Sequence, residues 1–336
     1  MIRPSAGGAR VWCLAFLGLG LPVCVALALT APLGETGRII VTDPTLLDAL
    51  GTLGLRAGEG FGLEPAAAAR LGRLADAAAY TGLGLAALAL ASRGQAALFA
   101  LLCLPASLAA SFSPDGLIIA LAALAAALLT PRPLTGPDGP ARRVGAALAI
   151  ALIVLANPPC APVAAMLLVP FPPPGRLGRF CRRRLSLAVL TLLPAALWTP
   201  LATARVVGAV DGLGGRDLVL PWPVYGLWAV ALLVPFLALR RGPLPPPAER
   251  LWLTGGALLG LGLAVLSHAL RARTDLGADR LDGLQGRDLL PLVPMLVLAF
   301  ARGRIGTAAS LRWPALLPVL AAAIDVAALP LVVLRA

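Results

Sequence analysis

A short polar segment, Gln285-Gly286-Arg287-Asp288, directly precedes an apolar stretch that runs to Phe300 and contains two prolines. A guanidinium, a carboxylate and an amide are costly at the edge of a lipid core. A guanidinium at a helix N-terminus favours a phosphate or pyrophosphate, because the helix dipole and the fork of N–H donors both attract anions. The alternative interpretation is an interface anchor, with Arg287 snorkelling and Asp288 capping the helix.

Four further residues are candidates for chemistry at the same predicted face: Glu35, Asp43 in VTDP, Asp115 in SFSPDGL and Asn157 in ANPPC. A carboxylate at a membrane edge that faces a cavity can orient a substrate or accept a proton. Each residue also has a structural interpretation. Asp115 is suited to an N-cap, Asn157 before proline to a turn, and the other two to an ordinary loop.

No metal site is predicted from the ligand types. The single histidine, His268, cannot hold a metal alone, and the five cysteines have no metal-binding spacing. Oxygen ligands from the carboxylates could hold a divalent ion, although no spacing argues for one. We therefore assign no cofactor from the sequence.

The composition determines which elements must position these residues. The 336 residues are 59% hydrophobic and 13% charged, and the mean hydropathy is +0.89. Backbone groups in lipid must be satisfied internally, and the alternation of a barrel is absent, so the spans are predicted to be helices. The fold class is all-α, with residues 1–336 forming a single integral membrane domain. The net charge of +12 comes from arginines in short loops, which excludes a basic nucleic-acid-binding module.

Apolar runs predict about eleven transmembrane helices. The first is interpreted as an uncleaved span, because no small-residue cleavage site follows it, and residues 34–73 are predicted to be its outer loop. The predicted spans cover residues 11–33, 74–92, 95–113, 115–130, 144–156, 160–171, 185–204, 222–239, 251–270, 288–301 and 314–334.

The pair 144–156 and 160–171 is either a hairpin of short helices or one broken span, because the prolines after Asn157 interrupt the apolar run. With a hairpin and a cytoplasmic N-terminus, most of the 28 arginines lie in inner loops. A single span places fewer than half of them there. The positive-inside rule therefore favours the hairpin, with the C-terminus outside.

Two other sequence patterns concern the distribution of charge across the membrane and the packing of the spans. Most of the 16 carboxylates fall on the outer side, Asp138 and Glu249 being the two predicted inside. Solvation of longer outer loops and chemistry at the outer face both account for that imbalance. Gly256 and Gly260 have the G-x-x-x-G spacing that allows two helices to approach closely.

Three segments resemble one bacterial family of multi-spanning proteins, known as domain of unknown function (DUF) 2142. QGRDLLPLVP resembles its late Q-G-R motif, LPASLAASFSPDGLIIALA its third-span motif, and LANPPCAPVAAMLL its proline-containing hairpin. The resemblance extends over roughly residues 66–304. Asn157 stands where the family usually has Lys, Cys160 where it has Tyr, and Asp288 where it has an aromatic residue.

The resemblance implies a function, because the family is grouped with the multi-spanning GT-C glycosyltransferases. These use a polyprenyl-phosphate sugar donor and act at the extracytoplasmic face. By position, Asp115, Gln285, Gly286 and Arg287 match family motif positions, and Asp288 and Asn157 join them as substrate-binding candidates. Glu35 is the expected first-loop base, with Asp43 second, although that loop is shortened and its motif reduced.

The implied setting is the bacterial cytoplasmic (inner) membrane and the assembly of a cell-envelope glycan. A lipid-linked sugar donor and a glycan or lipid acceptor are the expected partners, together with membrane lipids and without nucleic acid. Two alternatives are a transporter or flippase for a lipid-linked intermediate, and a non-catalytic membrane subunit of an envelope-assembly complex.

We predict that a cysteine at position 287, in a cysteine-free background, reacts with a membrane-impermeant maleimide added from outside. A cysteine at position 302, in a predicted inner loop, should react only after the membrane is permeabilised. Because the two positions flank one predicted span, the pair tests its orientation. The orientation is wrong if position 287 requires permeabilisation and position 302 does not.

Overall fold

The computed structural model is mainly helical over the residues that it describes, and those residues include no strand. It describes residues 6–30, 47, 49–104, 114–130, 139–170, 184–193, 227–228, 230–232, 244–274, 289–300, 316–324 and 326–327. The fold class is therefore all-α over the described residues, as the apolar runs predict.

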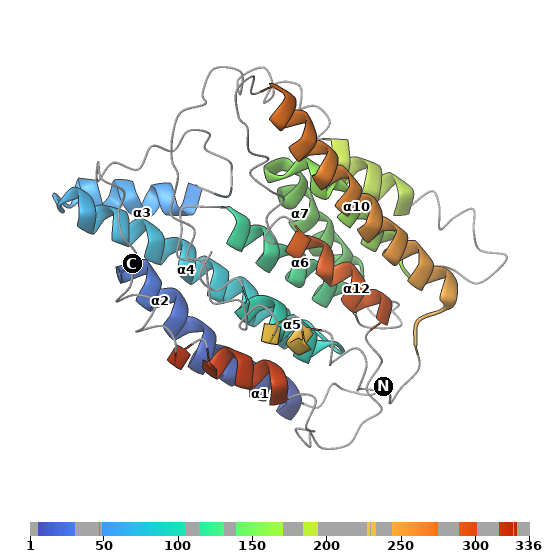
Figure 1. Cartoon of the computed structure of the whole chain (residues 1–336), viewed down its shortest axis with the longest axis horizontal. Coiled ribbons are helices and arrows are strands. Elements are labelled where there is room, and N and C mark those ends of the chain that lie inside the picture. The colour runs from blue at the N-terminus through green and yellow to red at the C-terminus, as the bar shows by residue number, and fades with distance from the viewer. Residues whose placement is uncertain are drawn as a thin grey trace.

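The helices in the first third are α1 (Ala6–Ala15), a π-helical turn η1 (Phe16–Gly20), α2 (Leu21–Thr30), α3 (Ala49–Gly60), α4 (Pro65–Leu90) and α5 (Gln95–Cys103). The later ones are α6 (Asp115–Leu129), α7 (Gly139–Ala156), the 3-10 helix η4 (Pro158–Leu168), α10 (Pro247–Thr274), the 3-10 turn η5 (Leu290–Leu292) and α12 (Val293–Phe300). A helix also covers residues 184–193. Figure 1 shows their arrangement.

Three of the described helical segments are long and apolar enough to cross a membrane: Ala9–Thr30, Gly139–Ala156 and Pro247–Ser267. Each corresponds to a predicted span. Helix α6 matches the predicted span 115–130 almost residue for residue. Helix α7 begins at Gly139, five residues before the predicted start at 144, so its 18 residues extend for about 27 Å.

The prediction that residues 34–73 form an outer loop is wrong for the part that the structure describes. Helix α3 lies within that range, and α4 already begins at Pro65, not at residue 74. The two helices pack closely, because Gly58 lies against Ala68 and Gly51 against the Asp76 carboxylate. A Cβ added at Gly58 would approach the Ala68 Cα to 2.7 Å. Glycine at these positions is therefore what allows the contact.

The turn between α3 and α4 is a glycine-terminated helix end. Gly62 has a φ of +71°, a left-handed backbone conformation that residues with a Cβ rarely adopt. The N–H of Leu63 donates to the Gly58 carbonyl and that of Gly62 to the Glu59 carbonyl, both at 3.0 Å. This is the Schellman pattern, in which the last carbonyls of a helix are satisfied locally. In Figure 1 the α3–α4 pair projects beyond the other labelled helices.

The N-terminal helices run antiparallel to α4. The Cys13 thiol lies 3.8 Å from the Leu85 carbonyl oxygen, and the rings of Phe16 and Tyr80 have centroids 6.3 Å apart. The Tyr80 hydroxyl donates to the Leu102 carbonyl and so ties α4 to α5. A buried phenol in an apolar core requires such a partner.

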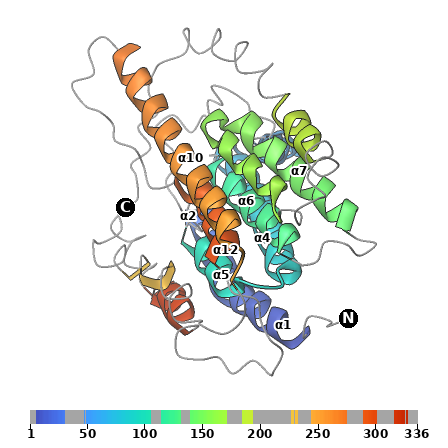
Figure 2. The same ribbon diagram turned by 90° about the vertical axis from the view of Figure 1, so that its right-hand side faces the viewer.

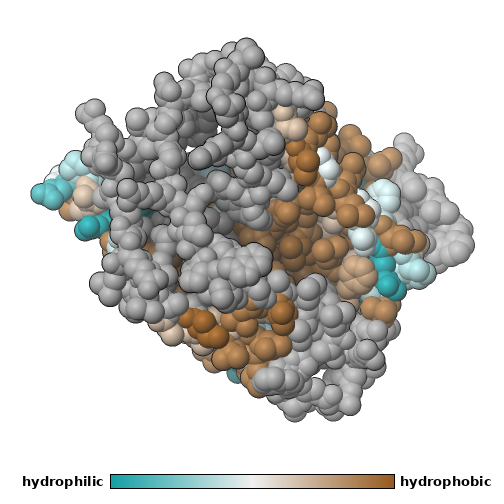
Figure 3. All heavy atoms as spheres, viewed as in Figure 1, coloured by the Kyte–Doolittle hydropathy of each residue, from teal (hydrophilic) through white to brown (hydrophobic). Residues whose placement is uncertain are grey.

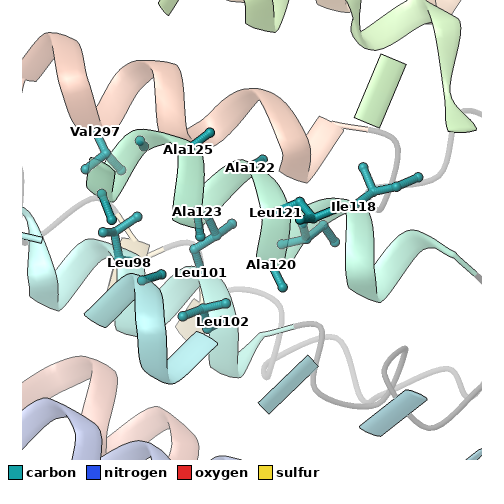
Figure 4. Packing of buried hydrophobic residues seen from close by; sticks show 14 of the residues in the cluster. Leu98, Leu101, Leu102, Ile118, Ala120, Leu121, Ala122, Ala123, Ala125 and Val297 are labelled. Carbon is teal, nitrogen blue, oxygen red and sulfur yellow. The ribbon is translucent and has the colours of Figure 1, made fainter. Parts of the chain in front are cut away.

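The core lies where α5, α6 and α12 meet. Ala120, Ala122 and Ala123 of α6 have no exposed surface, and alanine at these positions lets neighbouring helices approach closely. Figure 4 shows Leu98 and Leu101 of α5 on one side of α6 and Val297 of α12 near Ala125. The bundle is thus held by close helix packing, which is the main source of association between helices in lipid.

Helix α10 runs antiparallel to both η4 and α12. Toward η4, the Trp252 indole N–H donates to the Ala165 carbonyl at 3.2 Å. Toward α12, a Cβ on Gly256 would lie 2.6 Å from the Met295 Cε and one on Gly260 2.5 Å from a Leu292 methyl carbon. The predicted close approach at the G-x-x-x-G pair is therefore confirmed, and Figure 2 shows α10 beside α12.

The outer surface of α10 is apolar. Leu251 is 75% exposed, Leu258 62% and Leu259 59%. Figure 3 shows the hydrophobic surface that covers this side of the molecule. Large exposed aliphatic side chains along a helix of this length are typical of a lipid-facing surface.

We predict that Gly58→Ala lowers the thermal unfolding midpoint in detergent relative to Gly60→Ala. Both changes improve helix propensity, but the Gly58 Cβ would meet Ala68, whereas the Gly60 Cβ would meet nothing within 4 Å. Overpacking against a backbone costs about 1–3 kcal/mol. Equal midpoints for the two variants would show that the α3–α4 contact does not exist as described.

Candidate functional site

Asp115 and Asn157 lie at the same end of the helix bundle. Helices α6 and α7 pack together, and the Leu128 side chain near the end of α6 lies against Gly145 near the start of α7. In this antiparallel pairing the start of α6, at Asp115, falls beside the end of α7, at Ala156. Asn157 follows directly. The sequence prediction that these two residues share a face is thus supported.

The start of η5 joins them at this end. The three-residue turn η5 contacts both α6 and η4, and Leu292 packs on Gly260, far along α10 from its first turn. The starts of α6, η4 and η5 are therefore gathered at one end, which we term the helix-start end. The first N–H groups of α6 have no partner within the helix and favour negative charge, whereas η4 begins with two prolines, which have no N–H.

Asp115 is the first residue of α6, with Pro114 preceding it as the cap. The Ile118 N–H donates to the Pro114 carbonyl at 2.9 Å, so this first turn is regular. Asp115 is half-buried. A carboxylate in the first turn complements the helix dipole, and this structural role is compatible with the predicted substrate-orienting one.

Asn157 interrupts the helical backbone with φ −139° and ψ 87°. Its N–H donates to the Ile153 carbonyl at 2.7 Å, and its carbonyl accepts from the Cys160 N–H at 2.9 Å. The Asn157 side chain makes no capping hydrogen bond to η4 and is half-buried. It is therefore placed at the helix-start end without being used to begin the helix. Cys160 is buried, with 2% of its surface exposed.

The other predicted site residues, Glu35, Asp43, Gln285, Gly286, Arg287 and Asp288, lie outside the described residues. The first described residue after the Gln285–Asp288 segment is Leu289, which leads into η5. Across the described part of the chain, no group of three or more His, Cys, Asp or Glu is arranged to hold a metal ion.

The opposite end of the bundle holds a charged cluster that the sequence interpretation did not identify. Glu249, in the first turn of α10, is 1% exposed. Arg184 donates through Nη1 to the carbonyls of Leu168, at 3.3 Å, and Pro170. Arg184 also interacts electrostatically with Glu249 and with Arg143 near the start of α7. The end of η4 thus returns to the start of α7, and the chain reverses at Asn157 as the hairpin prediction requires.

The charge of Arg184 persists in this cluster. Arg184 precedes the predicted span 185–204, and burial lowers the pKa of its guanidinium to about 10. The positive charge of Arg143 lowers the pKa further, and the carboxylate of Glu249 raises it. Because the pKa stays well above neutral pH, Arg184 remains a cation. One sequence signal pointed to the cluster, since Glu249 is one of two carboxylates predicted on the arginine-rich side.

A second polar contact joins two further helix ends. The Ser92 N–H, just after α4, donates to the Thr130 hydroxyl at 3.0 Å, just after α6. Thr130 in turn donates to the Ala127 carbonyl at 2.7 Å. Helices α4 and α6 therefore end at the same level. This agrees with the predicted topology, in which both spans end on the inner side.

The comparison with protein families supports the resemblance that the motifs suggested. The family described as "Predicted membrane protein (DUF2142)" matches the chain over residues 44–208. The matched range includes Asp115 and Asn157 and ends before Gln285. No curated protein and no solved structure matches the chain significantly. The DUF2142 family description identifies a membrane protein and assigns no activity.

We predict that Glu249→Gln lowers the thermal unfolding midpoint, because a buried carboxylate next to Arg184 is lost. The expected cost is about 1–3 kcal/mol, typical of removing one partner of a buried charged interaction. Glu59→Gln is the matched control, since Glu59 is exposed on α3. A midpoint for Glu249→Gln equal to that of the control would contradict the cluster.

Proposed function

We propose that this protein is a polyprenyl-phosphate-sugar-dependent glycosyltransferase that acts at the extracytoplasmic face in cell-envelope glycan assembly. The observation that carries the proposal is the gathering of the starts of α6, η4 and η5 at one end of the bundle. The first turn of α6 leaves backbone N–H groups without a partner in the helix, and these favour an anionic group such as a carrier phosphate.

The polar residues of this end have distinct proposed roles. Arg287, two residues before Leu289 in the sequence, pairs with the carrier phosphate as negative charge builds on the leaving group. Gln285, Gly286 and Asp288 complete the headgroup contacts. Asn157, whose side chain does not cap η4, hydrogen-bonds the sugar or phosphate.

Proton transfer and sugar orientation fall to the carboxylates. Glu35, with Asp43 as the second choice, accepts the proton of the acceptor hydroxyl as the glycosidic bond forms. The carrier phosphate leaves with the electrons of the broken bond. Asp115, at the first turn of α6, orients the sugar or holds Arg287. The apolar surface of the bundle accommodates the polyprenyl chain between helices and lipid.

The assay uses the full chain in proteoliposomes with a panel of radiolabelled polyprenyl-phosphate hexoses and a membrane extract as acceptor source. Transfer releases free polyprenyl phosphate, which a flippase or a non-catalytic subunit does not. A protein that moves the donor across the bilayer without release would be a transporter. Neither release nor movement would favour the subunit alternative.

We predict that Arg287→Ala reduces the transfer rate by about 10²–10³-fold, as expected when one group that stabilises transition-state charge is removed. Asp115→Asn should reduce it by about tenfold or more, because sugar orientation is impaired. Glu64→Gln is the control, since it removes an exposed carboxylate predicted on the same face. Full activity in Arg287→Ala, with the protein folded, would exclude the proposed role.

A further inference from the structure

The end of the bundle opposite the helix-start end holds more positive than negative groups among the described residues. Arg142 and Arg143 lie near the start of α7, Arg184 starts the 184–193 helix, and Glu249 and Arg250 lie in the first turn of α10. Four cations and one carboxylate leave a formal charge of +3. An excess of this size, in partly buried side chains, favours an anion from outside the protein.

The arginines carry unused donors. The Nη1 of Arg142, the Nε of Arg143 and the Nε of Arg250 are buried and have no hydrogen-bond partner within the described part of the chain. Buried N–H groups of charged side chains rarely remain without acceptors. Arg184 differs, because it donates to two carbonyls at the end of η4. Arg250 is also held by the Phe300 ring, with its Cζ 5.3 Å from the centroid. Arg184 and Arg250 are thus held in place by contacts within the protein. Donor nitrogens of Arg142, Arg143 and Arg250 have no acceptor among the described residues.

Apolar surface continues directly from each arginine along its own helix. Each arginine-bearing helix exposes large apolar side chains within about two turns of its arginine: Val144 (51%), Leu148 (63%), Leu185 (54%), Val189 (54%), Leu251 (75%) and Trp252 (43%). A free anion would not need such a surface. A molecule with a phosphate and acyl chains would contact both the arginines and the aliphatic side chains.

We propose that Arg142 and Arg143 bind the phosphate of an anionic phospholipid whose acyl chains lie along the exposed faces of α7 and the 184–193 helix. Arg184 and Glu249 act as positioning residues, since they hold the end of η4 against the starts of these helices. This lipid site lies at the opposite end from the proposed transferase site and is independent of that function.

The test measures lipids retained by the full-length protein in native mass spectrometry after purification with a mixture of phosphatidylglycerol and phosphatidylcholine. Wild-type protein should retain phosphatidylglycerol in preference to phosphatidylcholine. Arg143→Gln should weaken phosphatidylglycerol binding by about tenfold or more, as expected for the loss of a charge-assisted hydrogen bond. Arg10→Gln is the matched control, because it removes one exposed arginine from the same predicted face and should change the affinity by less than about twofold.

Two further measurements keep the proposal open to refutation. Arg143→Lys preserves the charge, so a folded Arg143→Lys protein should bind phosphatidylglycerol with an affinity between those of wild type and Arg143→Gln. Inorganic phosphate added to lipid-free protein in detergent should not raise the unfolding midpoint as phosphatidylglycerol does. The proposal is overturned by equal retention of the two lipids, by equal effects of Arg143→Gln and Arg10→Gln, or by equal stabilisation from inorganic phosphate.

Discussion

The antiparallel packing of α10 against η4 and α12 is the constraint on which the rest of the arrangement depends. Gly256 lies against Met295 and near Ala165, so one turn of α10 contacts both neighbours. A larger side chain there would separate the three elements. Because the register is fixed at this point, the first turn of α10 must lie near the ends of η4 and α12. The starts of η4 and η5 must then lie together at the other end.

The sequence predicted the elements of the bundle better than their limits. Apolar runs place α6 correctly because its ends coincide with Pro114 and Thr130, where the hydrophobic pattern also stops. Helix α7 begins before its apolar run. Arg142 and Arg143 continue the helix beyond the lipid core, and a prediction based on apolar residues does not include them. Helix α3 was missed since its glycine content is typical of loops. The spacing of Gly51, Gly54 and Gly58 marks one face of a helix, and this signal could have revealed it.

The candidate site was predictable only in part. The positions of Asp115 and Asn157 at one end follow from counting spans, which required no tertiary contacts. The charged cluster around Glu249 depends on Arg184 and Arg143, which are far from it in the sequence. No periodic pattern encodes such a contact, because each arginine taken alone is indistinguishable from an ordinary inner-loop arginine.

The placement of these arginines has a physical cost that contacts with neighbouring helix ends offset. Arg184 and Arg250 lie in the first turns of their helices, where the helix dipole disfavours positive charge. Each reaches the C-terminal end of a neighbouring helix, where the dipole favours it. Arg184 donates to carbonyls at the end of η4, and Arg250 lies over Phe300, the last residue of α12. Arg142 and Arg143 each bury a guanidinium nitrogen with no acceptor among the described residues. The phosphate of a bound phospholipid, as proposed above, would supply the acceptor that this pair lacks.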